Sequence, residues 1–146
     1  MDDKLNKQKR ISGSEKLNRT SESKTPKRSF RDSFKDAARG IAVGIVEERN
    51  MKIHMLAIVL VLIFGIIFRL GLAEWGICLC FLALIPALEL VNTAIESAVD
   101  LVTEEYHPLA KRAKDVAAGA VLWASVIAAV AGAMIFLPKL LGIPVS

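Results

Sequence analysis

The chain has 146 residues, which is room for one domain, and 53% of them are hydrophobic against 23% that are charged. Of its 19 Lys and Arg residues, 14 lie between Lys4 and Lys52, whereas the 22 residues from Val116 to Leu137 carry no charge. About 20 consecutive apolar residues cross a bilayer, so this segregation favours a membrane protein and argues against a nucleic-acid partner, despite a formal charge of +4.

The first 29 residues are mostly polar and contain no apolar run that resembles the core of a signal peptide. We expect residues 1–29 to form a disordered basic tail in the cytoplasm, where their cations are attracted to anionic lipid headgroups.

A helix is predicted over residues 30–50, because apolar residues such as Phe30 and Phe34 recur at helical spacing while polar residues face away. An amphipathic helix of this kind is expected to lie in the membrane interface. Gly40 and Gly44 are four residues apart on it, so either they allow another helix or a lipid chain to approach closely, or they carry no packing role.

Three membrane-spanning helices are predicted, over residues 53–72, 75–103 and 110–141. With the surface helix they make one all-α integral-membrane domain over residues 30–146. A cytoplasmic amino terminus then places 17 Lys and Arg residues inside and only Arg69 and Lys139 outside, as the positive-inside rule requires. Cys78 and Cys80 point to different sides of the second span, so we expect apolar packing rather than a disulfide or a metal site.

The second span ends in an acidic face. At about 100° per helical residue, Glu89, Asn92, Glu96 and Asp100 fall within a sector of roughly 80°. Glu89 lies about 21 Å along the helix from Trp75, so it is expected in the inner leaflet below the headgroups, while Glu96 and Asp100 reach toward the cytoplasm. Acidic groups at such depth are costly and therefore indicate a function.

This face has the residue types that phosphoryl transfer needs. Glu96 is the natural carboxylate for magnesium, which takes one or two protein carboxylates and completes its shell with water and phosphates, and Glu48 is a second candidate at similar depth. Glu89, the most deeply embedded acid, is placed to take the proton of a lipid hydroxyl as a general base.

A cationic segment follows the second span. Lys111, Arg112 and Lys114 lie there beside carboxylates and are available to a polyphosphate, although basic residues are also expected in any cytoplasmic loop. The chain has no G-x-x-x-x-G-K-[ST] loop and no protein-kinase signature, so ATP must bind in another way.

The main alternative to an enzyme is a small ion-conducting or transporter subunit whose carboxylates line a pathway. The polar groups lie only toward the inner ends of the spans, and Ser125 is the one polar side chain between Val116 and Leu137. A path across the bilayer needs more polar groups, which favours the enzyme.

The residues Glu89-Leu-Val-Asn-Thr-Ala-Ile-Glu-Ser-Ala-Val-Asp100, followed by His107-Pro-Leu-Ala-Lys-Arg-Ala-Lys-Asp115, resemble the small integral-membrane diacylglycerol kinase family of bacteria. The flanking segments Glu48–His54, Glu74-Trp75 and Phe136–Leu140 look most similar to its Gram-positive branch, whose members are undecaprenol kinases. The resemblance covers about Phe30 to Leu140.

The resemblance implies a homotrimer with active sites shared between neighbouring chains in the cell membrane. It implies transfer of the ATP γ-phosphate to a lipid alcohol with Mg²⁺, at the cytoplasmic leaflet. Undecaprenol is the preferred acceptor and diacylglycerol the alternative.

The resemblance also implies roles for individual residues. Glu89 matches the general base, and Glu48 and Glu96 match the metal-binding carboxylates. The ATP-binding positions are Glu48, Asn92, Glu96, Asp100, Glu105, Tyr106, His107, Lys114 and Asp115, and the lipid substrate is expected at Glu89, Ser33, Asn50 and His54. Ser29 and Asp36 depart from the family, since they stand where relatives carry an arginine and a tyrosine; Arg28 or Arg31 are candidates to replace the arginine.

Overall fold

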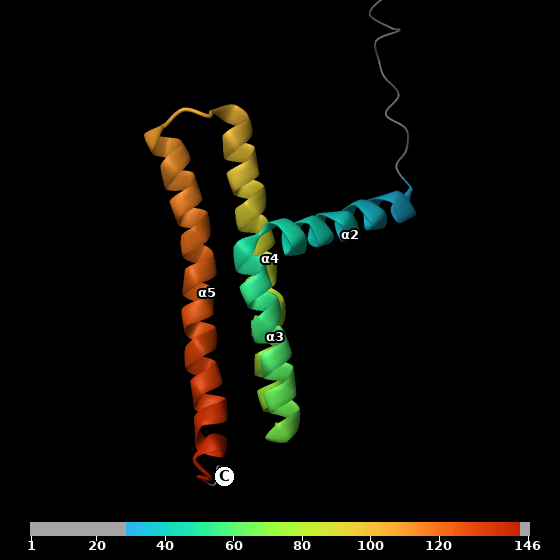
Figure 1. The fold of residues 1–146 in the computed structure, drawn as a ribbon, viewed down its shortest axis with the longest axis vertical. Helices are drawn as coiled ribbons and strands as arrows, with labels where there is room; N and C mark the ends of the chain where they lie inside the picture. Colours follow the sequence, from blue (N-terminus) through green and yellow to red (C-terminus); the bar gives the residue numbers. More distant parts are fainter. Residues whose placement is uncertain (1–28, 144–146) are drawn as a thin grey trace, which may run out of the picture. The chain divides into compact units, whose positions relative to one another are not determined.

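The computed structural model describes residues 29–143, and in this range the chain is helical without any strand (Figure 1). The expected tail, residues 1–29, lies outside the described residues except for Ser29. The helices are α2 (Phe30–Glu47), α3 (Arg49–Ile67), α4 (Leu72–Val102) and α5 (Pro108–Leu140). The last three are long and apolar enough to cross a membrane. The prediction of an all-α membrane protein with three spans is confirmed.

The chain divides into two compact units, one ending at Lys35 and the other beginning at Asp36. The described part of the first unit contains only the first turn of α2, where the Ser33 hydroxyl donates a hydrogen bond of 3.5 Å to the Ser29 carbonyl oxygen. Every residue described there is solvent-exposed. The site residues other than Ser33 therefore belong to the second unit.

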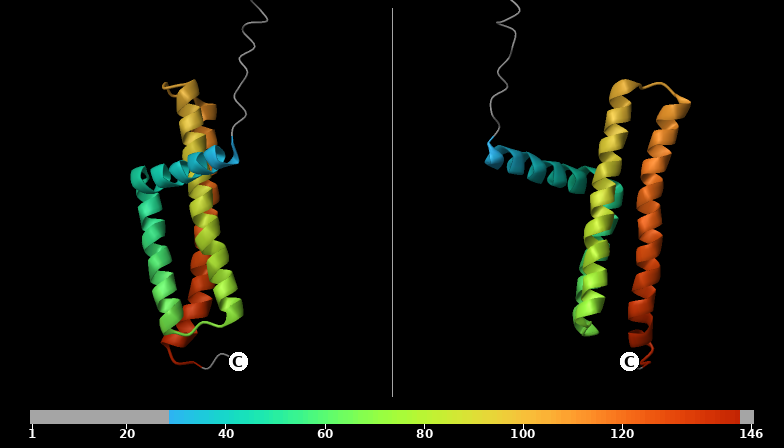
Figure 2. Two further views of the ribbon diagram at one scale, coloured as in Figure 1. Left: turned by 90° about the vertical axis from the view of Figure 1, so that its right-hand side faces the viewer. Right: turned by 180° about the vertical axis from the view of Figure 1, so that it is seen from behind.

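In the second unit α3, α4 and α5 run antiparallel, each connected to the next by a short loop (Figure 2). Helix α4 packs against both neighbours, and most extensively against α5. Most of the large apolar side chains on the three helices point outward, including Ile66, Leu79 and Met134. Such a surface suits lipid chains or other copies of the protein.

The α3–α4 turn closes the end of the bundle that lies away from the acidic face. Arg69 adopts a left-handed backbone with φ of 52°, and the Leu70 amide donates to the Gly65 carbonyl oxygen at 3.0 Å. Nearby, the Glu74 carboxylate accepts a hydrogen bond from the Gly71 amide at 2.7 Å and lies 3.1 Å from the Lys139 ammonium. These contacts fix the start of α4 against the end of α5.

An elbow at Glu48 separates α2 from α3. The surface helix ends at Glu47, earlier than residue 50, and Glu48 has an extended backbone with ψ of 124°. One turn before the elbow, a Cβ added to Gly44 would collide with the Leu90 side chain, whereas one added to Gly40 would meet nothing within 4 Å. Because Gly44 has no Cβ, α2 can approach the side chain of Leu90, the residue after Glu89 on α4. Gly40 makes no such close contact.

Helix α4 continues without a break through Pro86 to Val102. Cys78 is buried and Cys80 is exposed, so the two free thiols point to different sides of α4. The α4–α5 loop ends at His107, whose Nδ1 accepts a hydrogen bond of 3.3 Å from the Leu109 amide and so caps α5. This cap holds the loop at the end of the bundle that carries the acidic face.

Candidate active site

The acidic face of α4 grades from buried to exposed along the helix. Glu89 is 2% exposed and Asn92 is 6% exposed, Glu96 is half-buried, and Asp100 is open to solvent. Residues at i, i+3 or i+4 share a helix face, so one regular helix is enough to align the four side chains. The buried end of the face is the one that the depth estimate placed below the headgroups.

A pocket of about 280 Å³ opens on this face, and because several polar side chains line it we call it the polar pocket. Glu89, Asn92 and Glu96 line it from α4, Asn50 and His54 line it from α3, and Ser125 lines it from α5. Its other lining residues are Ile53, Ala118, Val121 and Leu122. The general base, one metal-binding carboxylate and two of the lipid positions expected from sequence are thus brought together.

Two acceptor groups in the polar pocket have no partner among residues 29–143. The Asn92 amide nitrogen donates to Glu96 Oε1 at 2.9 Å, but the buried Asn92 Oδ1 has no hydrogen-bond partner in the described part of the chain. Within residues 29–143 the Glu89 carboxylate makes neither a hydrogen bond nor an ion pair. Burying polar groups without partners opposes folding, which indicates that a bound molecule completes them.

A second pocket of about 290 Å³ adjoins the polar one and is lined almost entirely by apolar side chains. We call it the apolar groove. It shares two residues with the polar pocket, His54 and Ser125, and continues between α3, α4 and α5 to Phe136. A molecule with a polar head and a hydrocarbon chain fits across this boundary.

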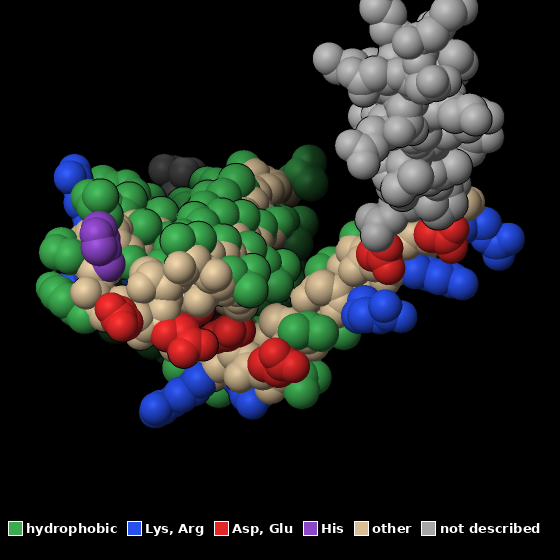
Figure 3. Space-filling view, turned by 90° about the horizontal axis from the view of Figure 1, so that it is seen from above, with side chains coloured by type: hydrophobic (Ala, Val, Ile, Leu, Met, Phe, Trp, Pro, Cys, Tyr) green, Lys and Arg blue, Asp and Glu red, His purple; other side chains and the backbone are tan. Residues whose placement is uncertain are grey.

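The α4–α5 loop forms a third pocket, of about 460 Å³, beyond the exposed end of the acidic face. Its lining includes six of the residues expected to bind ATP, namely Asp100, Glu105, Tyr106, His107, Lys114 and Asp115. Viewed onto this end of the helices, acidic side chains gather beside hydrophobic ones (Figure 3). We call this the loop pocket.

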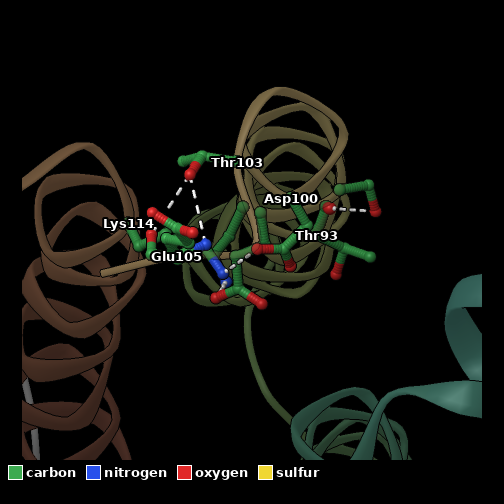
Figure 4. A network of polar contacts seen from close by, with 8 residues as sticks. Thr93, Asp100, Thr103, Glu105 and Lys114 are labelled. Carbon is green, nitrogen blue, oxygen red and sulfur yellow. Dashed lines mark hydrogen bonds and ion pairs between the residues drawn. The ribbon is translucent and has the colours of Figure 1, made fainter. Parts of the chain in front are cut away.

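Ion pairs hold the lysines of the loop pocket. Lys114 reaches from α5 to Asp100 on α4 at 2.6 Å (Figure 4), whereas Lys111 pairs within its own helix with Asp115 at 2.5 Å. The Thr103 hydroxyl also bonds both the amide and the carbonyl oxygen of Glu105 at 3.2 Å. In both ion pairs the side chains of the two partners are more than a third exposed. The ion pairs therefore orient these side chains more than they stabilise the fold.

Not every expected site residue joins these pockets. Glu48 does not line the polar pocket, although Asn50, two residues later, does. Ser33 belongs to the first unit. No group of three or more His, Cys, Asp or Glu side chains that could hold a metal ion occurs between residues 29 and 143. The metal-binding role of Glu48 and the lipid-binding role of Ser33 stay predictions.

Ser125 lines two of the pockets but is not among the site residues expected from the sequence. In the sequence it is the single polar side chain between Val116 and Leu137. The structure places it at the boundary between the polar pocket and the apolar groove. Its isolation in a 22-residue apolar stretch was the available signal.

The family model for prokaryotic diacylglycerol kinase matches residues 35–136, which include all three pockets. The chain belongs to this family. An undecaprenol kinase of Bacillus subtilis is 49% identical over 111 residues, covering 76% of this chain and 90% of that protein. A diacylglycerol kinase of Synechocystis is 40% identical over 114 residues, covering 77% of this chain and 65% of that protein. A diacylglycerol kinase of Escherichia coli K12 is 45% identical over 47 residues, covering 32% of this chain and 38% of that protein.

Family membership decides between the enzyme and the ion-conducting subunit that the sequence analysis considered. The protein is a multi-pass membrane lipid kinase that uses ATP as phosphoryl donor, and not an ion-conducting subunit. This agrees with a polar pocket that contains a buried carboxylate and adjoins the apolar groove, with the charged loop pocket further along α4.

Proposed function

We propose that this protein phosphorylates the hydroxyl of undecaprenol, with ATP and Mg²⁺, at the cytoplasmic leaflet of the cell membrane. The observation that carries the proposal is the junction of the polar pocket and the apolar groove, with Glu89 on its polar side. The hydroxyl enters the polar pocket and the hydrocarbon chain stays in the groove.

Glu89 acts as the general base. The alcohol proton passes to the Glu89 carboxylate, a bond forms between the alcohol oxygen and the γ-phosphorus of ATP, and the bond to the β,γ-bridging oxygen breaks to release ADP. The Glu89 carboxylate is free for this role because it has no internal partner within the described residues. Its burial also keeps water, the competing acceptor, away from the phosphate.

ATP is proposed to lie with its phosphates along the acidic face and its remaining part in the loop pocket. Lys114 supplies a cation there, and Glu105, Tyr106, His107 and Asp115 line the same pocket. Asn92 and Glu96 lie along α4 between Glu89 and Asp100, which lines that pocket. This places the γ-phosphate toward the lipid hydroxyl.

Glu96 fits a magnesium ligand. It is half-buried in the polar pocket, and the Asn92 amide holds one carboxylate oxygen at 2.9 Å, so the other is left for a ligand. Mg²⁺ usually takes only one or two protein carboxylates together with water and phosphate oxygens, so Glu96 with Glu48 is a sufficient set. A bound ion neutralises charge on the transferring phosphate.

Two observations favour undecaprenol over diacylglycerol. The Bacillus subtilis relative, which aligns over 90% of its own length, is named an undecaprenol kinase. The apolar groove also offers only His54 and Ser125 as polar neighbours, whereas a diacylglycerol would bring ester groups close to its hydroxyl. An alcohol attached directly to a hydrocarbon chain leaves no such polar group unpaired.

The assembly and orientation rest on the family resemblance and on charge. We propose a homotrimer with shared active sites, in which exposed apolar faces of α3, α4 and α5 meet between chains. The excess of Lys and Arg in segments on the side of the amino terminus favours a cytoplasmic amino terminus.

The proposal is tested with purified full-length protein in vesicles, labelled ATP and Mg²⁺, and undecaprenol or diacylglycerol offered side by side. We expect faster transfer to undecaprenol. Faster transfer to diacylglycerol would reverse the choice of acceptor, and transfer to neither would overturn the proposal.

A further inference from the structure

Ser125 occupies a particular place in the site, at the boundary between the polar pocket and the apolar groove. Only Ser125 and His54 line both. His54 belongs to α3 and Ser125 to α5, so the two face the boundary from different helices. An alcohol whose hydroxyl reaches Glu89 and whose chain enters the groove crosses the boundary that these two residues line.

The hydroxyl of Ser125 is available for a ligand. Helical Ser and Thr side chains commonly donate to the carbonyl oxygen four residues earlier. Thr93 does so to the Glu89 carbonyl oxygen at 3.1 Å, and Ser97 does so to that of Thr93 at 2.9 Å. Within residues 29–143 the Ser125 hydroxyl makes no hydrogen bond, although it is half-buried.

A second observation also indicates that a polar ligand binds in the polar pocket. Asn92 is 6% exposed and its Oδ1 has no hydrogen-bond partner in the described structure. Asn92 Oδ1 is an acceptor and the oxygens of the Glu89 carboxylate can accept hydrogen bonds, whereas the Ser125 hydroxyl can donate one. The α5 wall thus supplies a donor opposite two acceptors on α4.

We propose that Ser125 is a positioning residue that donates a hydrogen bond to the oxygen of the lipid alcohol. This inference rests on the proposed function. The alcohol oxygen has one proton and two lone pairs: the proton goes to Glu89, one lone pair accepts from Ser125, and the other attacks the γ-phosphorus. Ser125 itself is unchanged by the reaction, in which the proton ends on Glu89 and ADP leaves.

The role is specific to the alcohol and not to the nucleotide. Ser125 lines neither the loop pocket nor the exposed end of the acidic face. Its loss should therefore raise the KM for the lipid and leave the KM for ATP unchanged. Because the hydroxyl is common to both candidate alcohols, the effect should be similar with undecaprenol and with diacylglycerol.

The test compares Ser125→Ala with Ser97→Ala in the full-length protein, reconstituted in vesicles that contain either alcohol. Ser97 has a hydroxyl that is already bonded to the backbone and lines none of the three pockets. Ser125→Ala should raise the KM for the alcohol by about 3- to 10-fold, the range expected for one hydrogen bond, with the KM for ATP within about twofold. Ser97→Ala should change neither value.

A second pair of variants separates hydrogen bonding from packing. Ser125→Thr and Ser125→Val have the same shape and differ only in the hydroxyl, so the Thr variant should have the lower KM for the alcohol. Equal values in this pair, or a change confined to the KM for ATP, would overturn the role of Ser125 while leaving the kinase intact. A wild-type protein that phosphorylates neither alcohol would overturn both proposals.

Discussion

Lys114 on α5 lies 2.6 Å from Asp100 on α4, and this pair connects the two helices beside the loop pocket. The lysine side chain is 35% exposed and the aspartate side chain is 61% exposed, so the pair contributes little to stability. The ion pair instead positions the Lys114 ammonium at the side of the loop pocket where phosphates are proposed to bind.

Replacing Lys114 with Met should therefore impair nucleotide binding rather than folding. We expect the KM for ATP to rise at least about 10-fold, as for a lost charge-assisted hydrogen bond, with little change in thermal stability. Arg112→Met is the matched control, since Arg112 is a neighbouring cation that does not line the loop pocket. Equal effects of the two substitutions on the KM for ATP would show that only the net charge of the segment matters.

Glu89→Gln tests the general base. The carboxylate is buried and has no partner among the residues that the structure describes, and glutamine has nearly the same shape, so the variant should fold at least as well as the wild type. The kcat should fall by about 10²- to 10⁴-fold while ATP still binds. Turnover and nucleotide binding are measured separately on the same preparation, and a Glu89→Gln protein with wild-type kcat would exclude proton transfer to this residue.

The fold follows closely from the sequence, and the site follows only in part. Hydropathy is enough to define three spans, and helical periodicity is enough to align Glu89 with Asn92 and Glu96, because both depend on local spacing. The extended backbone of Glu48, which separates α2 from α3, was not predicted, since polar residues around Glu48 permit a helix and the elbow lies beside the close contact of Gly44 with Leu90.

Contacts between helices were beyond sequence reasoning for a different reason. The rotation of α5 about its axis decides whether Ser125 faces Glu89, and a uniformly apolar span has no pattern that defines this rotation. The pairing of Lys114 with Asp100 similarly depends on the geometry of the intervening loop. Sequence placed both lysine and aspartate near the nucleotide but could not pair them.

Glu48 and Glu47 offer a direct comparison for the magnesium site. The two carboxylates are adjacent, but only Glu48 lies in the elbow and begins α3 as its N-cap. If Glu48 contributes a ligand, Glu48→Gln should raise the Mg²⁺ concentration needed for half-maximal rate by about 10-fold, the size of a lost charged contact, and Glu47→Gln should leave it unchanged. The assay titrates Mg²⁺ at saturating ATP and lipid. Unaltered Mg²⁺ dependence in Glu48→Gln would leave Glu96 as the protein ligand.

The turn between α3 and α4 depends on a glycine that packs against an aromatic ring. A Cβ on Gly65 would lie 2.6 Å from Cη2 of Trp75 and 3.2 Å from Leu70, so Gly65→Ala must displace a large ring and should lower the free energy of unfolding by about 1–3 kcal/mol. Gly76 follows Trp75 in the sequence, and a Cβ added to Gly76 would meet nothing within 4 Å. Gly76→Ala should therefore raise stability by up to about 1 kcal/mol, since alanine favours the helix. Thermal unfolding of the two variants in the same detergent measures the difference, and similar midpoints would mean that Trp75 moves aside without cost.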